Sequence, residues 1–397
     1  QINMSLIKST RIESIDLLRG VVMVIMALDH VRDYFFYGAF FVDPTDLETT
    51  TPILFFTRFI THYCAPVFVF LAGTSAYLYG TKKTKSQLSK FLFTRGIWLI
   101  FLEIILNNFI WTFDVSHSLS ILQVIWVIGL CMVCLSFLIH LPKKGILTLG
   151  IILVAAHNLL DGIIAEGTSF SSIIWYLLHQ DKFLALSNNN LVVFHYPAIP
   201  WIGLIALGYL FGTWYQKGYD TTIRKKWLLR IGLGSIIMFF ILRGINNYGD
   251  LVPWSIQETA TQTIMSFFKV TKYPPSLAFL LITIGPALLF LYAFEQTKNK
   301  ITNFFIVFGR VPLFYYFLHV LVIHLVAIIG ILVFGGEWQH MIITSDVFMN
   351  ARLLNYGYPL YIVYIVWIAI VLLLYPISKK YMIYKANNKD KWWLSYL

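Results

Sequence analysis

The sequence predicts an all-α fold: a polytopic membrane helix bundle of about 10 (10–11) transmembrane helices. Of its 397 residues, 58% are hydrophobic and only 12% are charged. Soluble domains carry roughly 25% charged residues, about twice that share. Apolar runs of roughly 20 residues recur along the chain, and this length crosses about 30 Å of hydrocarbon. Both observations indicate a protein embedded in a membrane.

Each long apolar run predicts one transmembrane helix. We expect helices at residues 15–37, 56–79, 91–113, 119–140, 145–163, 197–215, 227–246, 275–294, 303–334 and 358–378. The ninth run would extend about 48 Å as one straight helix. Gly309 and Pro312 disfavour continuous helix within it, so we expect a short interfacial piece before a span from residue 311. In the loop 164–196, the stretch SSIIWYLLHQ predicts a short amphipathic helix.

The distribution of Lys and Arg predicts the orientation of the bundle. Most of the basic residues fall on one set of segments: Lys8, Arg11, Lys82, Lys83, Lys85, Lys90, Lys143, Lys144, Lys217, Arg224, Lys225, Lys226, Lys298, Lys300, Lys379, Lys380, Lys385, Lys389 and Lys391. The opposite segments carry only Lys182, Lys269, Lys272 and Arg352. Both termini are therefore expected in the cytoplasm, with a cytoplasmic segment 1–14, a transmembrane domain 15–378 and a basic tail 379–397. The net charge of +11 mostly reflects this asymmetry, so we expect no nucleic-acid binding.

Four ionisable residues lie together near the far end of the first predicted span, in MALDHVRDYFF. Asp29, Arg32 and Asp33 share one helix face, and His30 is within reach of Asp33. Ionisable groups at membrane depth are costly and usually functional. A carboxylate beside an imidazole suits a general base, so we expect a catalytic role for His30 and Asp29. The alternative is an Asp–Arg cluster that merely ends the helix at the outer surface.

The second span carries Arg58 and His62 one helical turn apart, in TRFITHYCAPVFVF. On an antiparallel neighbour of the first span, they come to the same depth as His30. We expect both to face His30 and to orient an acceptor or stabilise an oxyanion. For His62, the alternative is a hydrogen-bonded packing residue.

Further polar residues are predicted inside the membrane or at its edges. Glu103 and Asn107 lie near the middle of the third span, where Glu103 serves either substrate or proton transfer or pairs with a neighbouring arginine. His319 is expected in the cytosolic half, lining a route from the cytosol or serving a structural role. Arg243 is a substrate-binding candidate at an outer helix end, where a purely interfacial position is the alternative. We expect no metal, because HxxxH and HExxH patterns are absent and two arginines sit among the candidate ligands.

These stretches resemble the heparan-α-glucosaminide N-acetyltransferase catalytic-domain family of membrane proteins. The resemblance rests on RIESIDLLRGVVMVIMALDHVRDYF, FTRFITHYCAPVFVFLAGTSAYLYG, FLFTRGIWLIFLEI, HYPAIPWIGLIALGYLFG, TKYPPSLAFLLITIGPAL and FGRVPLFYYFLH, over about residues 11–325. It implies a transmembrane acyltransferase that takes an acetyl group from cytosolic acetyl-CoA and delivers it to a sugar on the other side. In related membrane acyltransferases, a histidine near the end of the first span is catalytic, and His30 matches that position.

The acyl donor would need cations for its phosphate groups. The candidates at the cytosolic ends of the spans are Arg310, Arg95, Lys82 and Lys83. Arg310 stands beside the predicted helix break, where backbone N–H groups are free to bind an anion. An extended pantetheine arm of about 15–20 Å would then run past His319 and Glu103 towards His30.

We therefore expect an acetyltransferase in the inner cell membrane whose partners are acetyl-CoA, an extracytoplasmic sugar or glycan and membrane lipid. N- and O-acetylation, direct transfer and an acetyl-histidine intermediate, and monomer and homodimer all stay open. The alternative from another class is a proton-coupled transporter or lipid-linked sugar carrier that uses Asp29, His30, His62 and Glu103 as a relay. A structural membrane partner without its own chemistry is a third.

Overall fold

The computed structural model describes residues 12–187, 189–348 and 351–395, and most of them are helical. Lys8 and Arg11, two of the residues used to predict the orientation, lie outside the described residues. The α-helices are α1 Glu13–Phe35, α2 Pro52–Thr61, α3 Cys64–Gly80, α4 Lys85–Leu102, α5 Asn108–Thr112, α6 Val124–Leu138, α7 Lys143–Ala155, α8 Phe170–Leu178, α9 Ala198–Phe211, α10 Thr221–Ile245, α11 Ala260–Phe268, α12 Leu277–Ala293, α13 Lys300–Arg310, α14 Pro312–Val333 and α15 Leu360–Asn387. The shorter turns are π-helical Glu103–Asn107 and 3₁₀ His157–Leu160, Gly212–Tyr215, Trp338–Met341, Ala351–Leu353 and Trp392–Ser395.

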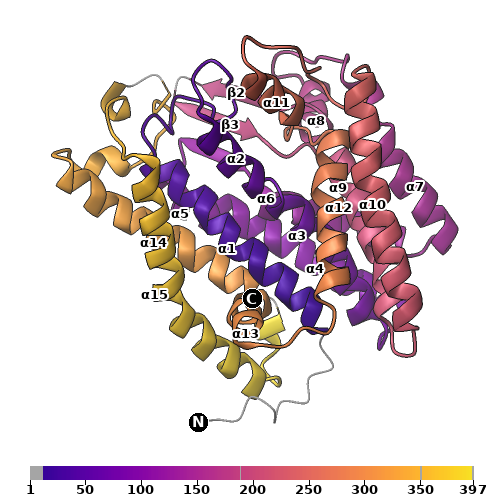
Figure 1. Ribbon diagram of the computed structural model, residues 1–397. Helices are drawn as coiled ribbons and strands as arrows, with labels where there is room; N and C mark the ends of the chain where they lie inside the picture. The colour runs from indigo at the N-terminus through magenta and orange to yellow at the C-terminus, as the bar shows by residue number, and fades with distance from the viewer. Residues whose placement is uncertain (1–11, 188, 349–350, 396–397) are drawn as a thin grey trace.

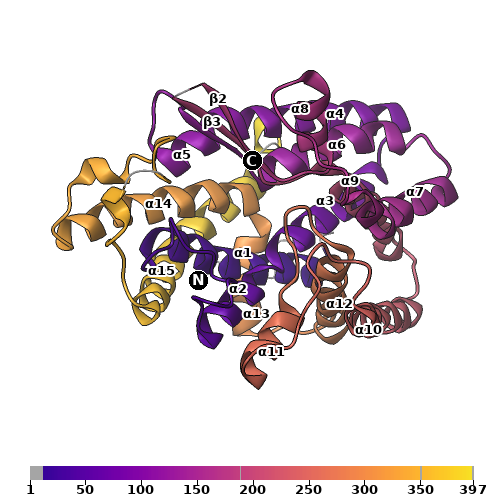
Figure 2. The same ribbon diagram turned by 90° about the horizontal axis from the view of Figure 1, so that it is seen from above.

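Helix α1 forms the centre of the bundle (Figures 1 and 2). It packs against α3, α13, α14 and α15, and nearly all of its residues are buried. Helices α10 and α12 pack together at one side, where α10 leaves much of its apolar surface exposed, as a lipid-facing helix does. The first helix begins, and the last ends, at the same end of the bundle (Figure 1).

The predicted membrane character is supported by helix length and composition. Among the described residues, five helical stretches are long and apolar enough to cross a membrane: Pro52–Gly80, Ala198–Tyr215, Thr221–Ile245, Pro312–Val333 and Leu360–Asn387. The count of ten spans and the orientation of the termini stay predictions. The break in the ninth run is confirmed, because α13 ends at Arg310 and α14 begins at Pro312. The short helix expected in the loop 164–196 is confirmed as α8.

The all-α prediction is wrong in one detail, because the bundle carries a three-stranded sheet. The strands are β1 Leu119–Leu122, β2 Lys182–Ser187 and β3 Asn190–Phe194. They lie in the order β1-β3-β2, with β1 parallel and β2 antiparallel to β3. Residues 119–122, predicted as the start of a span, are therefore extended. Figure 1 shows β2 and β3 at the end of the bundle opposite the start of α1, which we call the sheet end.

Helices α1 and α13 cross where two glycines meet. A Cβ on Gly20 would stand 1.9 Å from the carbonyl oxygen of Phe305, and a Cβ on Gly309 would stand 1.8 Å from that of Asp16. Only glycine permits so close an approach of two backbones. His30 lies ten residues beyond Gly20 on α1, or about 15 Å of helix, whereas His319 lies on α14, beyond the helix break that follows Gly309. Both α13 and α14 pack against α1, and His319 of α14 contacts His30.

Candidate active site

His30 is a buried residue in the last third of α1, and it contacts a histidine of α14. Its Nδ1 lies 2.8 Å from Nε2 of His319, and the two rings are nearly parallel, at 9°. Trp111 and Tyr316 contact its ring edge to face, with centroid distances of 4.8 and 5.9 Å. Nε2 of His30 makes no hydrogen bond with the described residues. The predicted base therefore has one nitrogen held and one available.

The predicted contact between His30 and Asp33 is not made, because both neighbouring aspartates bind arginines. Asp29 pairs with Arg32 at 2.8 Å and with Arg58 at 2.6 Å, and the hydroxyl of Thr61 donates to it at 2.8 Å. Arg32 also binds Asp33 at 2.6 Å. The shared helix face of these residues is as predicted, but the neighbouring arginines attract the carboxylates more strongly than a neutral imidazole does.

Arg58 reaches the level of His30, as predicted, through its pair with Asp29. His62 is buried against Phe59 and Phe279 and makes no hydrogen bond or ring contact with His30 among the described residues. Nδ1 of His62 is buried without a hydrogen-bond partner. Leaving a buried ring nitrogen without a hydrogen bond is energetically costly.

Glu103 is fully buried and binds the start of a neighbouring helix, and no arginine pairs with it among the described residues. Its carboxylate accepts a hydrogen bond from the side chain of Asn107 at 2.7 Å and from the backbone N–H of Trp126 in the first turn of α6 at 3.0 Å. An anion at a helix N-terminus satisfies free N–H groups and the helix dipole. The π-helical turn Glu103–Asn107 aims both side chains inwards. Asn107 also lies 3.4 Å from the hydroxyl of Tyr316, beside His30.

Arg243, a predicted substrate-binding residue, is buried and bound to backbone carbonyls. It donates to the carbonyls of Ser266 and Phe267 at 2.9 Å and to those of Val252 and Lys269 at 3.1 Å. Charged hydrogen bonds of this kind fix the loop between α10 and α12. Val252 and Lys269 line the cavity described below, so Arg243 shapes that cavity from behind it.

A cavity of about 400 Å³ opens at the end of the bundle where α1 begins. Four cations line it, namely Arg19, Arg95, Arg310 and Lys385, and we call this end the basic end. Asp16 holds two of them, because Arg19 and Arg310 each lie 3.3 Å from its carboxylate. Lys82 and Lys83, predicted for the same role, are exposed and do not line the cavity.

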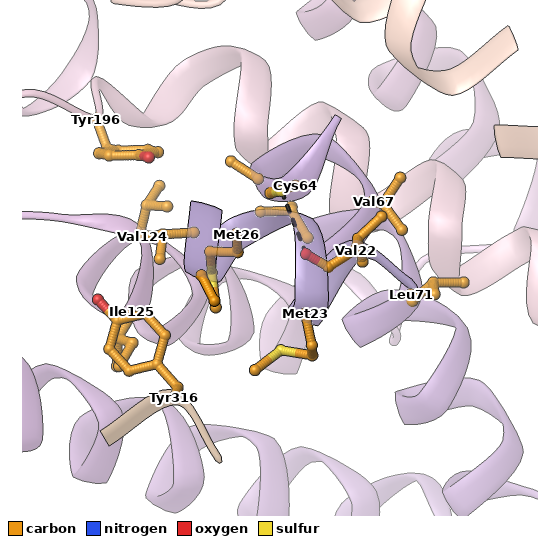
Figure 3. Packing of buried hydrophobic residues seen from close by; sticks show 14 of the residues in the cluster. Val22, Met23, Met26, Cys64, Val67, Leu71, Val124, Ile125, Tyr196 and Tyr316 are labelled. Atoms are coloured by element: carbon orange, nitrogen blue, oxygen red, sulfur yellow. Dashed lines mark hydrogen bonds between the residues drawn. The ribbon is translucent and has the colours of Figure 1, made fainter. Parts of the chain in front are cut away.

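The walls of this cavity are apolar and lead towards His30. They include Met23 and Met26 of α1, Ile125 of α6 and Tyr316 of α14, which gather in the core in Figure 3. Tyr316 lines the cavity and also contacts the ring of His30. The cavity therefore leads from a cationic entrance along apolar walls to Tyr316, which contacts the ring of His30.

A second cavity, of about 220 Å³, lies on the sheet-end side of the centre. Its lining is more polar than that of the first cavity and carries both signs of charge: Asp43, Thr45, Arg58, His62, Asp181, Val252, Lys269, Val270, Thr271, Lys272 and Tyr273. Arg58 connects it to the centre, because Arg58 binds Asp29, the residue before His30. Tyr273 stacks on His195, which pairs with Asp181 at 2.9 Å.

Fold and site define a helical membrane protein built around a buried histidine centre, which one cavity approaches from each end. The family model described as heparan-alpha-glucosaminide N-acetyltransferase, catalytic, matches residues 11–243. The match covers more than half of the chain, and the protein belongs to this family of transmembrane acetyltransferases. No curated protein matches the chain. The part of the resemblance beyond residue 243 stays a prediction.

Sequence reasoning did not predict several residues of the site. Tyr316 stands three residues before His319, so a shared helix face could have indicated it. Lys272 and Asp181 carry no such signal, because they come from loops.

Proposed function

We propose that the protein moves an acetyl group from acetyl-CoA, bound in the basic-end cavity, to the amine or hydroxyl of a sugar in the sheet-end cavity. His30, which lies between the two cavities, acts on the acceptor. The observation that carries this proposal is a pair of cavities beside one buried histidine: Tyr316, which lines the first, contacts the ring of His30, and Arg58, which lines the second, binds Asp29 next to His30. The family assignment supports the acetyl transfer itself.

The basic-end cavity has the chemistry that an acyl-CoA needs. Phosphate groups bind arginine and lysine through charged hydrogen bonds, and four such side chains line the entrance. The pantetheine arm and the acetyl group suit the apolar passage past Met26 to Tyr316. The excess of Lys and Arg on the segments of this end favours its cytosolic position, where acetyl-CoA is made.

The sheet-end cavity suits a polar acceptor. Its carboxylates, cations and hydroxyl groups offer hydrogen bonds to the several hydroxyl or amino groups of a sugar. The ring of His62 also lines this cavity. Arg58 and Lys272 place positive charge on this side of the centre, where the oxyanion forms when the thioester is attacked.

In the reaction, Nε2 of His30 takes the proton of the acceptor amine or hydroxyl while the acceptor attacks the acetyl carbon. The carbon–sulfur bond breaks, and the proton returns to the departing sulfur. Asp29 holds Arg58 in place and does not touch the imidazole. In the alternative route, His30 first takes the acetyl group itself and then passes it to the acceptor.

Radiolabelled acetyl-CoA and protein in sealed proteoliposomes test this proposal. The donor is placed on one side of the membrane, and glucosamine or an N-acetylated, hydroxyl-only sugar on the other. Label should reach an acceptor only with the donor at the basic end. His30→Ala should lower the rate by about 10²- to 10⁴-fold, the usual contribution of general acid–base catalysis. The variant should still bind acetyl-CoA, because His30 lines neither entrance.

Full activity in His30→Ala would contradict the assignment of the base. No binding of any acyl-CoA by the wild type would contradict the donor site, and a proton-coupled sugar transporter would then be favoured. The same vesicles measure that alternative as acceptor uptake driven by a pH gradient. Label on the N-acetylated, hydroxyl-only sugar indicates O-acetylation, and label on glucosamine alone indicates N-acetylation.

A further inference from the structure

We propose that His319 is a positioning residue: it fixes His30 as the tautomer with its proton on Nδ1, which leaves Nε2 as the reactive atom. The inference rests on the proposed function for its catalytic meaning, and on the hydrogen bonds of two rings for its geometry. His319 lies on α14, 289 residues along the chain from His30.

The proton positions follow from a chain of acceptors. Nδ1 of His319 lies 2.7 Å from the backbone carbonyl of Tyr315, and a carbonyl oxygen only accepts, so this nitrogen carries the proton. A neutral His319 then presents a lone pair at Nε2. The atom 2.8 Å away, Nδ1 of His30, must therefore be the donor. Nε2 of His30 is then left with a lone pair and has no hydrogen-bond partner among the described residues.

The surroundings hold this arrangement in place. His319 is fully buried, and its ring stacks on Tyr315 at 4.9 Å between centroids and 11° between planes. In the part of the chain that the structure describes, no carboxylate competes for the proton, because the nearby Asp29 and Asp33 are bound to arginines. A carboxylate in the place of His319 would be a buried charge with a large desolvation cost. A neutral imidazole performs the same orienting task without that cost.

The pair also offers a second place for positive charge during the reaction. When Nε2 of His30 takes the acceptor proton, the proton on Nδ1 can shift along the 2.8 Å hydrogen bond to His319. His319 would then carry both protons, each in a hydrogen bond, while His30 is neutral with its proton on Nε2. Reversal of the shift, as the Nε2 proton passes to the departing sulfur, restores both rings. Protons and charge therefore balance over one turnover.

Ring ¹⁵N NMR of the full-length protein in nanodiscs tests the proposal directly, because the shifts of a neutral histidine identify its protonated nitrogen. The signals of His30 are those that disappear in His30→Gln. We expect the proton on Nδ1 in the wild type and a mixture of tautomers in His319→Leu. His319→Leu should also lower kcat by about 10²-fold, with the KM for acetyl-CoA changed less than about 3-fold. His319→Gln keeps an acceptor for the Nδ1 proton and should recover part of kcat.

His140→Leu is the control, because His140 is an exposed histidine between α6 and α7 that lines neither cavity. In this variant kcat and the spectrum of His30 should stay as in the wild type. A wild-type spectrum with the proton of His30 on Nε2, or His319→Leu with wild-type kcat, overturns the proposal. If His319→Leu does not fold, the wild-type spectrum and His319→Gln decide. If the wild type transfers no acetyl group, the proposed function fails, and the spectrum still tests the hydrogen bond.

Discussion

Removal of the Arg310 side chain should weaken acetyl-CoA binding without unfolding the protein. Arg310 lines the basic-end cavity, and its side chain is only 16% exposed, so a bound phosphate would be partly shielded from water. A charged hydrogen bond is worth about 1.5–3 kcal/mol, which corresponds to a rise in Kd of about 10- to 100-fold. Asp16 keeps its contact with Arg19, so Arg310→Ala leaves no buried carboxylate unpaired.

Equilibrium dialysis of radiolabelled acetyl-CoA against protein in detergent measures this change. Lys82→Ala is the matched control, because Lys82 is a cation at the same end of the bundle, is exposed and does not line the cavity. Its Kd should change less than about 2-fold, as is usual for an exposed charge. The Kd of Arg310→Lys for acetyl-CoA should lie between those of Arg310→Ala and Lys82→Ala. Equal Kd values for Arg310→Ala and Lys82→Ala would refute the assignment of this cavity to the donor.

Three further predictions concern stability, measured by unfolding in detergent. Gly309→Ala should destabilise the protein by about 1–3 kcal/mol or more, because the new Cβ would meet a carbonyl oxygen at 1.8 Å. Gly234→Ala is the control and should be neutral, because a Cβ there meets nothing within 4 Å. Arg243→Ala should cost on the order of 3 kcal/mol, since it loses hydrogen bonds to four carbonyls, and Arg243→Lys less. Burial alone would raise the pKa of Asp114. Hydrogen bonds from Ser116 and Ser118 outweigh the effect of burial, so the pKa of Asp114 lies below its usual range. The stability from Asp114 should therefore be present above a pH of about 4 and be lost as the pH falls below it, and Asp114→Asn should flatten that dependence. Wild-type stability in Gly309→Ala or Arg243→Ala, or an unchanged acid profile in Asp114→Asn, would contradict these readings.

The helices were predictable because apolar runs and breakers carry a strong local signal. The break between Arg310 and Pro312 followed from a glycine and a proline within one apolar run. The contact between His319 and His30 did not follow, since it depends on how α13 and α14 pack against α1. A single apolar run does not encode tertiary packing of this kind.

The sheet and the loop residues of the sheet-end cavity were not predictable for a related reason. Leu119–Leu122 is as apolar as the helix that follows it, and its extended form depends on pairing with β3, which lies far along the chain. Lys272 and Asp181 reach the cavity from two different loops. For Glu103, a role in substrate or proton transfer and a pair with an arginine were both left open, and the hydrogen bond from the start of α6 was not predicted. In each case, the residues that come together are distant in sequence.

A structure of the protein with a non-transferable thioether analogue of acetyl-CoA tests the central claim most directly. The account predicts the phosphate groups among Arg19, Arg95, Arg310 and Lys385. It predicts the carbonyl carbon of the acetyl group about 3–3.5 Å, a reactive distance, from Nε2 of His30 or from an acceptor atom held by it. An analogue bound at the sheet end, or one whose acetyl group lies remote from His30, would contradict it.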